Sequence, residues 1–361
     1  MPMPQGRDLE LTRSQLREWF ATKLPSAKDL QLSPLTGPGT TGFSNDTLMF
    51  DLTWKEGGKQ RRDELVARIM PSGELVFPEY DLGLQFRVMQ ILGATDVPVP
   101  RALWMEQDRS VLDAPFYVME RVTGKIPPDS PTYHAEGWMK EISDESRSAI
   151  WWSGVEVLTR IQRLDWRALG FEFLDAPRWG ANALQQQLGY YEYYLEWAAQ
   201  GRPQPTTEAA LEWLKKNQPG VERVALCWGD SRLGNMIFHD DRCVAVLDWE
   251  MAGLGDPVRD FAWWLFFDYH HSVGAESPRL TGLPSRDETI ARYEEWTGVE
   301  VKNLHYYEVL AAFCFSAIMI RVAHTLRTYE LLPVESDFET NNTSTRLLAK
   351  MLDLPPPGST A

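Results

Sequence analysis

The hydrophobic pattern of this 361-residue chain changes near residue 122, and that change constrains the fold more than any other feature. Earlier segments favour strands, and the turn Lys55-Glu-Gly-Gly58 predicts a hairpin. Later segments repeat at helical spacing. Strands are expected over 47–54, 64–70, 101–106 and 115–122, and helices over 12–24, 82–92, 144–164, 183–200 and 208–216. This predicts an α+β fold, with an antiparallel sheet in residues 1–121 and helices in residues 122–361.

The charge balance of the chain argues against one class of function. The chain carries 36 Lys and Arg against 51 Asp and Glu, a formal charge of −15. Such a balance argues against a nucleic-acid partner, because sequence-independent binding needs clustered cations. It is compatible with cationic substrates and also with plain solubility.

Compartment signals favour the cytoplasm. The three cysteines provide no disulfide framework and suit a reducing environment. The N-terminus has no apolar signal core. The most apolar run, Val309 to Ile320, is too short to span a bilayer and predicts a buried helix, so no membrane partner is expected.

A short polar motif and the hairpin after it predict the chemistry. Four residues separate Asp230 from Asn235, the D-x-x-x-x-N spacing of a kinase catalytic loop. Two short strands follow, over 236–238 and 243–247, with a turn centred near Asp240-Asp241. That centre places Asn235 opposite the neighbourhood of Val246. Asn235 and Asp248 should therefore emerge at the same end of the hairpin, with Asp230 just before them.

These residue types match the needs of phosphoryl transfer. Mg²⁺ prefers carboxylate and amide oxygens, which Asp248 and Asn235 supply. Asp230 can accept the proton of an acceptor hydroxyl. The alternative is a hairpin whose flanking polar residues merely cap turns. The spacing alone would favour that alternative, whereas the spacing with Gly229, the hairpin and Asp248 favours the catalytic loop.

A family resemblance rests on three strings. They are Trp228-Gly-Asp-Ser-Arg-Leu-Gly-Asn235, Leu247-Asp-Trp-Glu250 and Gly255-Asp-Pro-Val-Arg-Asp260. Together they resemble the aminoglycoside phosphotransferase family, which includes choline-kinase-like enzymes. The family motif begins His-Gly-Asp, and Trp228 replaces that histidine at a position that supports the loop. The resemblance implies a two-lobed, protein-kinase-like fold that uses ATP and Mg²⁺.

The resemblance also assigns nucleotide-binding residues in the first third of the chain. Gly42, Phe43, Ser44 and Asn45 resemble the phosphate-binding loop between the first two strands, and Arg68 lies where kinases place the third-strand lysine. Met119, Glu120 and Val122 resemble the hinge that contacts adenine. The glutamate that usually pairs with the strand cation is missing, and either Gln85 or Glu79 could replace it.

Three acidic residues beyond the hairpin carry further expectations. Asp256 should be the N-cap of a helix with Pro257 in its first turn, and Asp260 should anchor the catalytic loop. Glu250 could reach a second Mg²⁺ or face solvent. At the N-terminus, Thr12 and Gln15 are expected to form a capping box.

The preferred interpretation is an ATP- and Mg²⁺-dependent phosphotransferase acting on a hydroxyl of a small molecule, either aminoglycoside-like or a metabolite. Asp230 is the predicted base, Asn235 and Asp248 are the predicted metal ligands, and Arg68 is the predicted phosphate cation. Two alternatives stay open. One is a catalytically weak nucleotide-binding regulator on the same fold, and the other is a metal-dependent hydrolase using Asp248 and Glu250.

Overall fold

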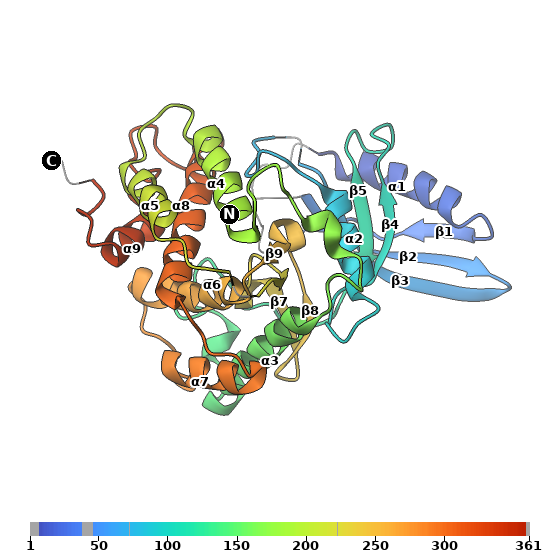
Figure 1. Ribbon diagram of the computed structural model, residues 1–361. Coiled ribbons are helices and arrows are strands. Elements are labelled where there is room, and N and C mark those ends of the chain that lie inside the picture. Colours follow the sequence, from blue (N-terminus) through green and yellow to red (C-terminus); the bar gives the residue numbers. More distant parts are fainter. Residues whose placement is uncertain (1–6, 38–45, 72, 222, 359–361) are drawn as a thin grey trace. The chain divides into compact units, whose positions relative to one another are not determined.

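The computed structural model describes residues 7–37, 46–71, 73–221 and 223–358 (Figure 1). The expected loop of Gly42, Phe43, Ser44 and Asn45 lies outside these residues. The chain divides into two compact units. The first contains Met1–Ala94 and Pro100–Val122, and the second contains Thr95–Val99 and Thr123–Ala361.

The first unit is an antiparallel five-stranded sheet with two helices. The strand order is β1-β2-β3-β5-β4. The strands are β1 (Lys28–Leu32), β2 (Asp46–Glu56), β3 (Lys59–Ile69), β4 (Ala102–Glu106) and β5 (Phe116–Glu120), and the helices are α1 (Leu9–Lys23) and α2 (Leu82–Leu92). The predicted hairpin is confirmed as β2–β3, and α2 has the predicted bounds.

Side-chain alternation along β2 builds the core of the first unit. Leu48, Phe50 and Leu52 are almost fully buried, as strand periodicity requires when one face packs on a core. Leu16 and Phe20 of α1 belong to the same core cluster. This packing supplies the hydrophobic stabilisation that holds α1 on the sheet.

The predicted capping box of Thr12 and Gln15 is wrong. The helix α1 begins three residues earlier, because the Asp8 side chain accepts the backbone N–H groups of Glu10 and Leu11. Thr12 is inside the helix, where its hydroxyl donates to the Asp8 carbonyl at 2.7 Å. A carboxylate N-cap satisfies the first orphan amides without help from Thr12.

The second unit is mainly helical and carries two short antiparallel strand pairs (Figure 1). Pairs β6–β9 and β7–β8 are formed by β6 (Ala225–Cys227), β7 (Met236–His239), β8 (Arg242–Val246) and β9 (Gly253–Gly255). The α-helices are α3 (Asp144–Arg163), α4 (Ala183–Ala199), α5 (Pro205–Lys216), α6 (Val258–Tyr269), α7 (Arg286–Thr297), α8 (Leu304–Thr328) and α9 (Thr343–Met351). Helices α3 to α5 confirm the predicted helical segments.

Helix α8 contains the most apolar run of the sequence. It is long and apolar enough to cross a membrane by composition, but 78% of its most apolar window is buried inside the protein. The same test is passed by core helices of globular proteins. The expectation that Val309 to Ile320 forms a buried helix is confirmed. Cys227, Cys243 and Cys314 are buried and free, as the absence of a disulfide framework predicted.

Candidate active site

The hairpin β7–β8 brings the two predicted metal ligands together. Met236 pairs with Val246, and the Leu247 N–H donates to the Asn235 carbonyl at 2.9 Å. Asp240 and Asp241 form the turn with positive φ values of 47° and 59°, as a two-residue hairpin turn requires. The predicted turn centre is therefore confirmed. The register places Asn235 and Asp248 at the same end of the hairpin.

The carboxylate of Asp230 is held by three side chains. Its Oδ1 accepts Arg232 Nε and Trp263 Nε1, each at 2.9 Å. Its Oδ2 accepts Asn235 Nδ2 at 2.6 Å. A carboxylate offers about four acceptor positions. Within the described residues, one position on Oδ2 therefore has no donor, and it can accept a hydroxyl.

The amide of Asn235 has a determined orientation. Its Nδ2 donates both to the Asp230 carboxylate and to the Asp230 carbonyl at 3.1 Å. Consequently its Oδ1 points away from Asp230, the orientation a metal ligand needs. Asn235 is 2% exposed, while Asp248 is half-buried and has the left-handed φ of 54°. One amide oxygen and one carboxylate suit Mg²⁺, which completes its shell with water and phosphate oxygens.

Glu250 lies just beyond Asp248 in a short 3₁₀ helix and is half-buried. Groups of three or more His, Cys, Asp or Glu that could hold a metal ion do not occur among the described residues.

Trp228, which occupies the position where the family motif has histidine, connects the D-x-x-x-x-N loop to the end of β8. Its indole Nε1 donates to the Leu247 carbonyl at 2.8 Å and to the Asp248 carbonyl at 3.2 Å. The side chain is fully buried. A nitrogen donor is thus preserved at this position although the residue type has changed. The next residue, Gly229, has a φ of +93°, and a Cβ there would overlap the Met251 carbonyl.

Asp260 anchors the predicted catalytic loop, residues 228–235, from the start of α6. Its carboxylate accepts the backbone N–H of Trp228 at 2.5 Å and that of Gly229 at 3.1 Å. The Ser231 hydroxyl donates to the Asp260 carbonyl at 2.6 Å. Burial raises the pKa of Asp260, while Arg259 and the two amides act in the opposite direction. The predicted anchoring role of Asp260 is confirmed.

The predicted N-cap at Asp256 needs a correction of one residue. The helix α6 begins at Val258, so Pro257 is the residue at the cap position. The Asp256 carboxylate still accepts the Val258 N–H at 2.9 Å. Proline at this position loses no hydrogen bond, because the N–H that it lacks would have no intrahelical acceptor at the start of the helix.

Sequence reasoning missed three residues around Asp230: Asp129, Arg232 and Trp263. Arg232 forms a close ion pair with Asp129 besides its bond to Asp230. Burial alone would lower the pKa of Arg232, but the two carboxylates raise it overall. Arg232 could have been noticed as a cation inside the D-x-x-x-x-N motif. Nothing in the local pattern around Asp129 or Trp263 pointed to the site.

A small cavity lies beside the catalytic loop within the second unit. Its walls are mostly aromatic, with polar groups from Arg232, Asp268 and His271. Burial lowers the pKa of His271 to about 3, so this histidine is neutral at physiological pH. The other lining residues are Tyr133, Trp151, Leu233, Trp264 and Phe267.

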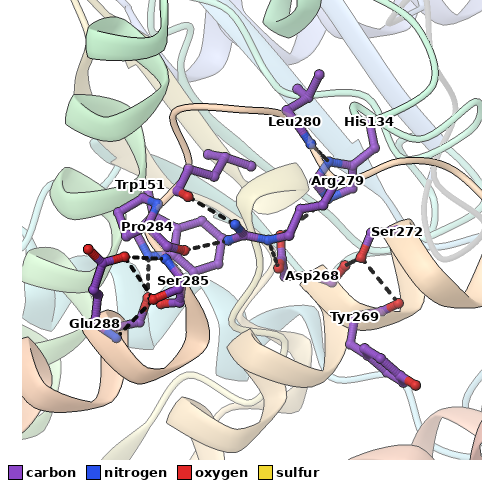
Figure 2. A network of polar contacts seen from close by, with 12 residues as sticks. His134, Trp151, Asp268, Tyr269, Ser272, Arg279, Leu280, Pro284, Ser285 and Glu288 are labelled. Atoms are coloured by element: carbon purple, nitrogen blue, oxygen red, sulfur yellow. Dashed lines mark hydrogen bonds and ion pairs between the residues drawn. The ribbon is translucent and has the colours of Figure 1, made fainter.

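A polar network fixes the far end of α6 (Figure 2). Asp268 accepts Arg279 Nε at 2.7 Å and lies 3.2 Å from His134 Nε2. His134 Nδ1 accepts the Leu280 N–H, so its Nε2 carries the proton donated to Asp268. Burial alone would raise the pKa of Asp268, but these two donors lower it overall. The network joins the segment before α3 to α6 and the loop before α7.

The described nucleotide-binding candidates lie on β3 and β5 or just after them. Arg68 on β3 is half-buried and pairs in register with Tyr117 of β5. Gln85 of α2 is buried, and its Oε1 accepts the Tyr117 hydroxyl at 3.3 Å. Met119 and Glu120 form the end of β5. Val122 is the last residue of the first unit.

Comparison with known families now defines the class of protein. Residues 40–296 match the model of the phosphotransferase enzyme family, which is more than half of the chain. The chain therefore belongs to this family, as the resemblance implied. Its antiparallel sheet followed by a helical unit is the protein-kinase-like α+β fold of these enzymes.

The chain also matches parts of longer curated proteins. It is 31% identical over 264 residues to acyl-CoA dehydrogenase family member 11 of Homo sapiens, covering 70% of this chain and 32% of that protein. It is 30% identical over 266 residues to family member 10 of Mus musculus, covering 71% and 24% respectively. The chain thus spans about a third or less of the length of these relatives.

Solved structures show the same fold at low sequence identity. A candidate aminoglycoside phosphotransferase from Ralstonia eutropha aligns over 94% of this chain and 95% of that chain, with a TM-score of 0.65 and 23% identity. Choline kinase from Streptococcus pneumoniae covers 94% and 99%, with a TM-score of 0.53 and 15% identity. An amicoumacin kinase in complex with AMP-PNP, Ca²⁺ and Ami covers 93% and 92%, with a TM-score of 0.51 and 10% identity.

Proposed function

We propose that this protein transfers the γ-phosphoryl group of ATP to a hydroxyl of a small molecule. The observation that carries the proposal is the arrangement of Asp230, Asn235 and Asp248. One acceptor position on Asp230 Oδ2 receives no donor from the described residues. Asn235 donates to the same oxygen through Nδ2, so the Asn235 amide oxygen points away from Asp230. A base and a pair of hard metal ligands at the end of one hairpin are what phosphoryl transfer requires.

The acceptor hydroxyl loses its proton to Asp230 Oδ2 while its oxygen forms a bond to the γ-phosphorus. The bond from that phosphorus to the β,γ-bridging oxygen breaks, and ADP leaves with the electron pair. Asn235 and Asp248 would hold Mg²⁺, which supplies charge neutralisation for the phosphate oxygens when bound.

Nucleotide binding is assigned to residues of the first unit. Arg68 would contact the phosphates, together with the backbone of the segment Gly42, Phe43, Ser44 and Asn45. Met119, Glu120 and Val122 would supply backbone contacts to adenine. The amicoumacin kinase complex supports this part, because that neighbour holds a non-hydrolysable ATP analogue with a divalent cation on the same fold.

The acceptor belongs to the small hydroxylated molecules, with aminoglycosides and metabolites as the two groups to separate. The test is ATP consumption by the purified protein against a panel of amino alcohols, sugars, hydroxylated metabolites and aminoglycosides, with Mg²⁺ present. Phosphorylated acceptor should be identified by mass spectrometry. GTP in place of ATP defines the nucleotide.

Asp248→Ala is the matched variant for this experiment. It should abolish Mg²⁺-dependent turnover while the folded state persists, because Asp248 is half-buried rather than part of the core. Phosphate release with no phosphorylated acceptor across the panel would favour a hydrolase. Tight Mg-ATP binding without turnover would favour a regulator, and near-native turnover of Asp248→Ala would remove Asp248 from the metal site.

A further inference from the structure

We infer that Asp129 and Arg232 form a positioning device that sets the orientation of the Asp230 carboxylate. The inference rests on the proposed role of Asp230 as the base. It goes beyond that role, because Asp129 lies about 100 positions before the D-x-x-x-x-N motif and Arg232 occupies one of its variable positions. Both would act through Asp230 and not by contact with the acceptor.

The guanidinium of Arg232 links the carboxylates of Asp230 and Asp129. The guanidinium is a rigid planar fork, so binding with two of its nitrogens fixes its plane. Nε donates to Asp230 Oδ1 at 2.9 Å, and Nη1 forms the close ion pair with Asp129 Oδ2. The Arg232 side chain is 19% exposed and packs over the Phe267 ring at 5.4 Å. One end of the fork therefore holds the base, and the other end is held by Asp129.

Asp129 is itself held against the loop by close packing. Gly234 lies between Arg232 and Asn235, and a Cβ at this glycine would overlap both carboxylate oxygens of Asp129. The loop thus has room for the Asp129 carboxylate only because residue 234 lacks a side chain. Asp129 Oδ1 is buried and has no hydrogen-bond partner among the described residues, although His271 Nδ1 lies 3.9 Å away. Arg232 is therefore the side chain that binds the Asp129 carboxylate through Oδ2.

The segment that carries Asp129 is tied to the same helix that supports the catalytic loop. Thr132 Oγ1 donates to the His271 carbonyl at 2.9 Å, and the Tyr133 hydroxyl donates to Asp268 at 3.1 Å. His134 joins Asp268 in the network at the far end of α6 (Figure 2). At the other end of α6, Asp260 holds the loop backbone. The contacts with α6 thus fix the positions of Asp129 and Asp230 relative to each other.

The consequence for chemistry concerns which oxygen of Asp230 is available. Arg232 and Trp263 both donate to Oδ1, so the remaining acceptor position is on Oδ2. Without Arg232, Oδ1 would also accept new donors and the carboxylate could rotate about its Cβ–Cγ bond. A base that is misplaced by about 1 Å can cost roughly 10²-fold in rate.

The Trp263 indole offers a readout that does not depend on activity. Because Trp263 Nε1 donates to Asp230 Oδ1, its ¹H–¹⁵N resonance reports the position of that oxygen. The resonance can be assigned among the 15 tryptophans by comparison with Trp263→Phe. Arg232→Ala should shift this resonance and lower kcat by about 10²-fold, with little change in Mg-ATP affinity. Added guanidinium ion should restore both the resonance and turnover in part.

Two further variants and one control keep the test decisive. Arg232→Lys keeps the charge but loses the fork, and Gly234→Ala should displace Asp129 without changing any charged group; both should shift the Trp263 resonance in the same direction. Arg202→Ala breaks a comparable ion pair, Arg202 Nε to Glu339 Oε1 at 2.9 Å, away from the loop. It should leave the Trp263 resonance and turnover unchanged and should not respond to guanidinium.

The outcomes separate this inference from the proposed function. An unshifted Trp263 resonance in Arg232→Ala and Gly234→Ala would overturn the positioning role, as would lost turnover that guanidinium does not restore. Wild-type protein that phosphorylates no acceptor would defeat the proposed function, while the Trp263 resonance would still decide whether Arg232 holds Asp230.

Discussion

Asp230 and Asp260 both have carboxylates at the predicted catalytic loop, but the two carboxylates accept hydrogen bonds from different kinds of donor. The Asp230 side chain is 15% exposed, and its carboxylate accepts hydrogen bonds from the side chains of Arg232, Trp263 and Asn235. Asp260 is fully buried, and its carboxylate accepts backbone amides of Trp228 and Gly229. The first arrangement orients a carboxylate and leaves it an acceptor position, whereas the second uses a carboxylate to hold the chain. We therefore propose that the Asp230 carboxylate serves the reaction, whereas the Asp260 carboxylate holds the backbone of the loop.

Asp230→Asn should produce the largest effect on rate. The change keeps size and one oxygen acceptor but removes the proton acceptor, which is typically worth about 10²–10⁴-fold, or roughly 3–5 kcal/mol of barrier. Single-turnover phosphoryl transfer measures the loss, once an acceptor is known. Nucleotide titration and urea unfolding should change little. A large loss of ATP affinity would mean that Asp230 serves the nucleotide site instead.

Asp260→Ala should give the opposite signature, a loss of stability. Two buried backbone amides would lose their acceptor, at a cost of about 2–4 kcal/mol in the free energy of unfolding. Urea denaturation measures this value directly. Asp260→Asn is the control, since it retains one oxygen acceptor and should lose less. If Asp260→Ala unfolds at the wild-type midpoint, the proposed division between a reacting and a holding carboxylate breaks down.

Arg68→Ala extends the comparison to the first unit. A charge-assisted contact with phosphate should be worth about 1.5–3 kcal/mol in ATP affinity, whereas kcat at saturating ATP should change far less than in Asp230→Asn. Isothermal titration with Mg-ATP provides the affinity. Arg87→Ala, on the helix α2, is a nearby substitution that should leave the affinity close to wild type. Equal affinities for Arg68→Ala and wild type would count against Arg68 as the phosphate cation.

Trp228→Phe should produce the smallest effect. It keeps the aromatic packing but removes the indole donor to the Leu247 and Asp248 carbonyls, at a cost of about 1 kcal/mol in stability. The apparent Mg²⁺ affinity for turnover should weaken slightly, because the backbone of Asp248 loses this support. Trp228→His, which restores the family residue, should recover part of both quantities. An effect as large as that of Asp260→Ala would show that Trp228 does more than support this strand end.

Local patterns predicted most of the elements and the centre of the site. The two-residue turns and alternating strands of β2–β3 and β7–β8 follow from short-range geometry, which a single sequence expresses directly. The same is true of α2 and α3 to α5. By contrast, β1, the short strand β9 and the helix α9 were not anticipated. A strand as short as Gly253–Gly255 has no periodicity of its own and exists because Ala225–Cys227 lies beside it.

By itself the sequence determined the fold class and the family, and it predicted the D-x-x-x-x-N motif of Asp230 and Asn235 with Asp248 at the same end of the following hairpin. Only the tertiary structure decided what holds Asp230 in place. Arg232 reaches Asp129 across 103 positions of the chain, and Trp263 reaches Asp230 across 33. The physical reason is that periodicity and spacing report contacts within a turn or a hairpin. Which distant side chain fills the space beside a carboxylate depends on how helices such as α6 pack, and no local pattern encodes that packing.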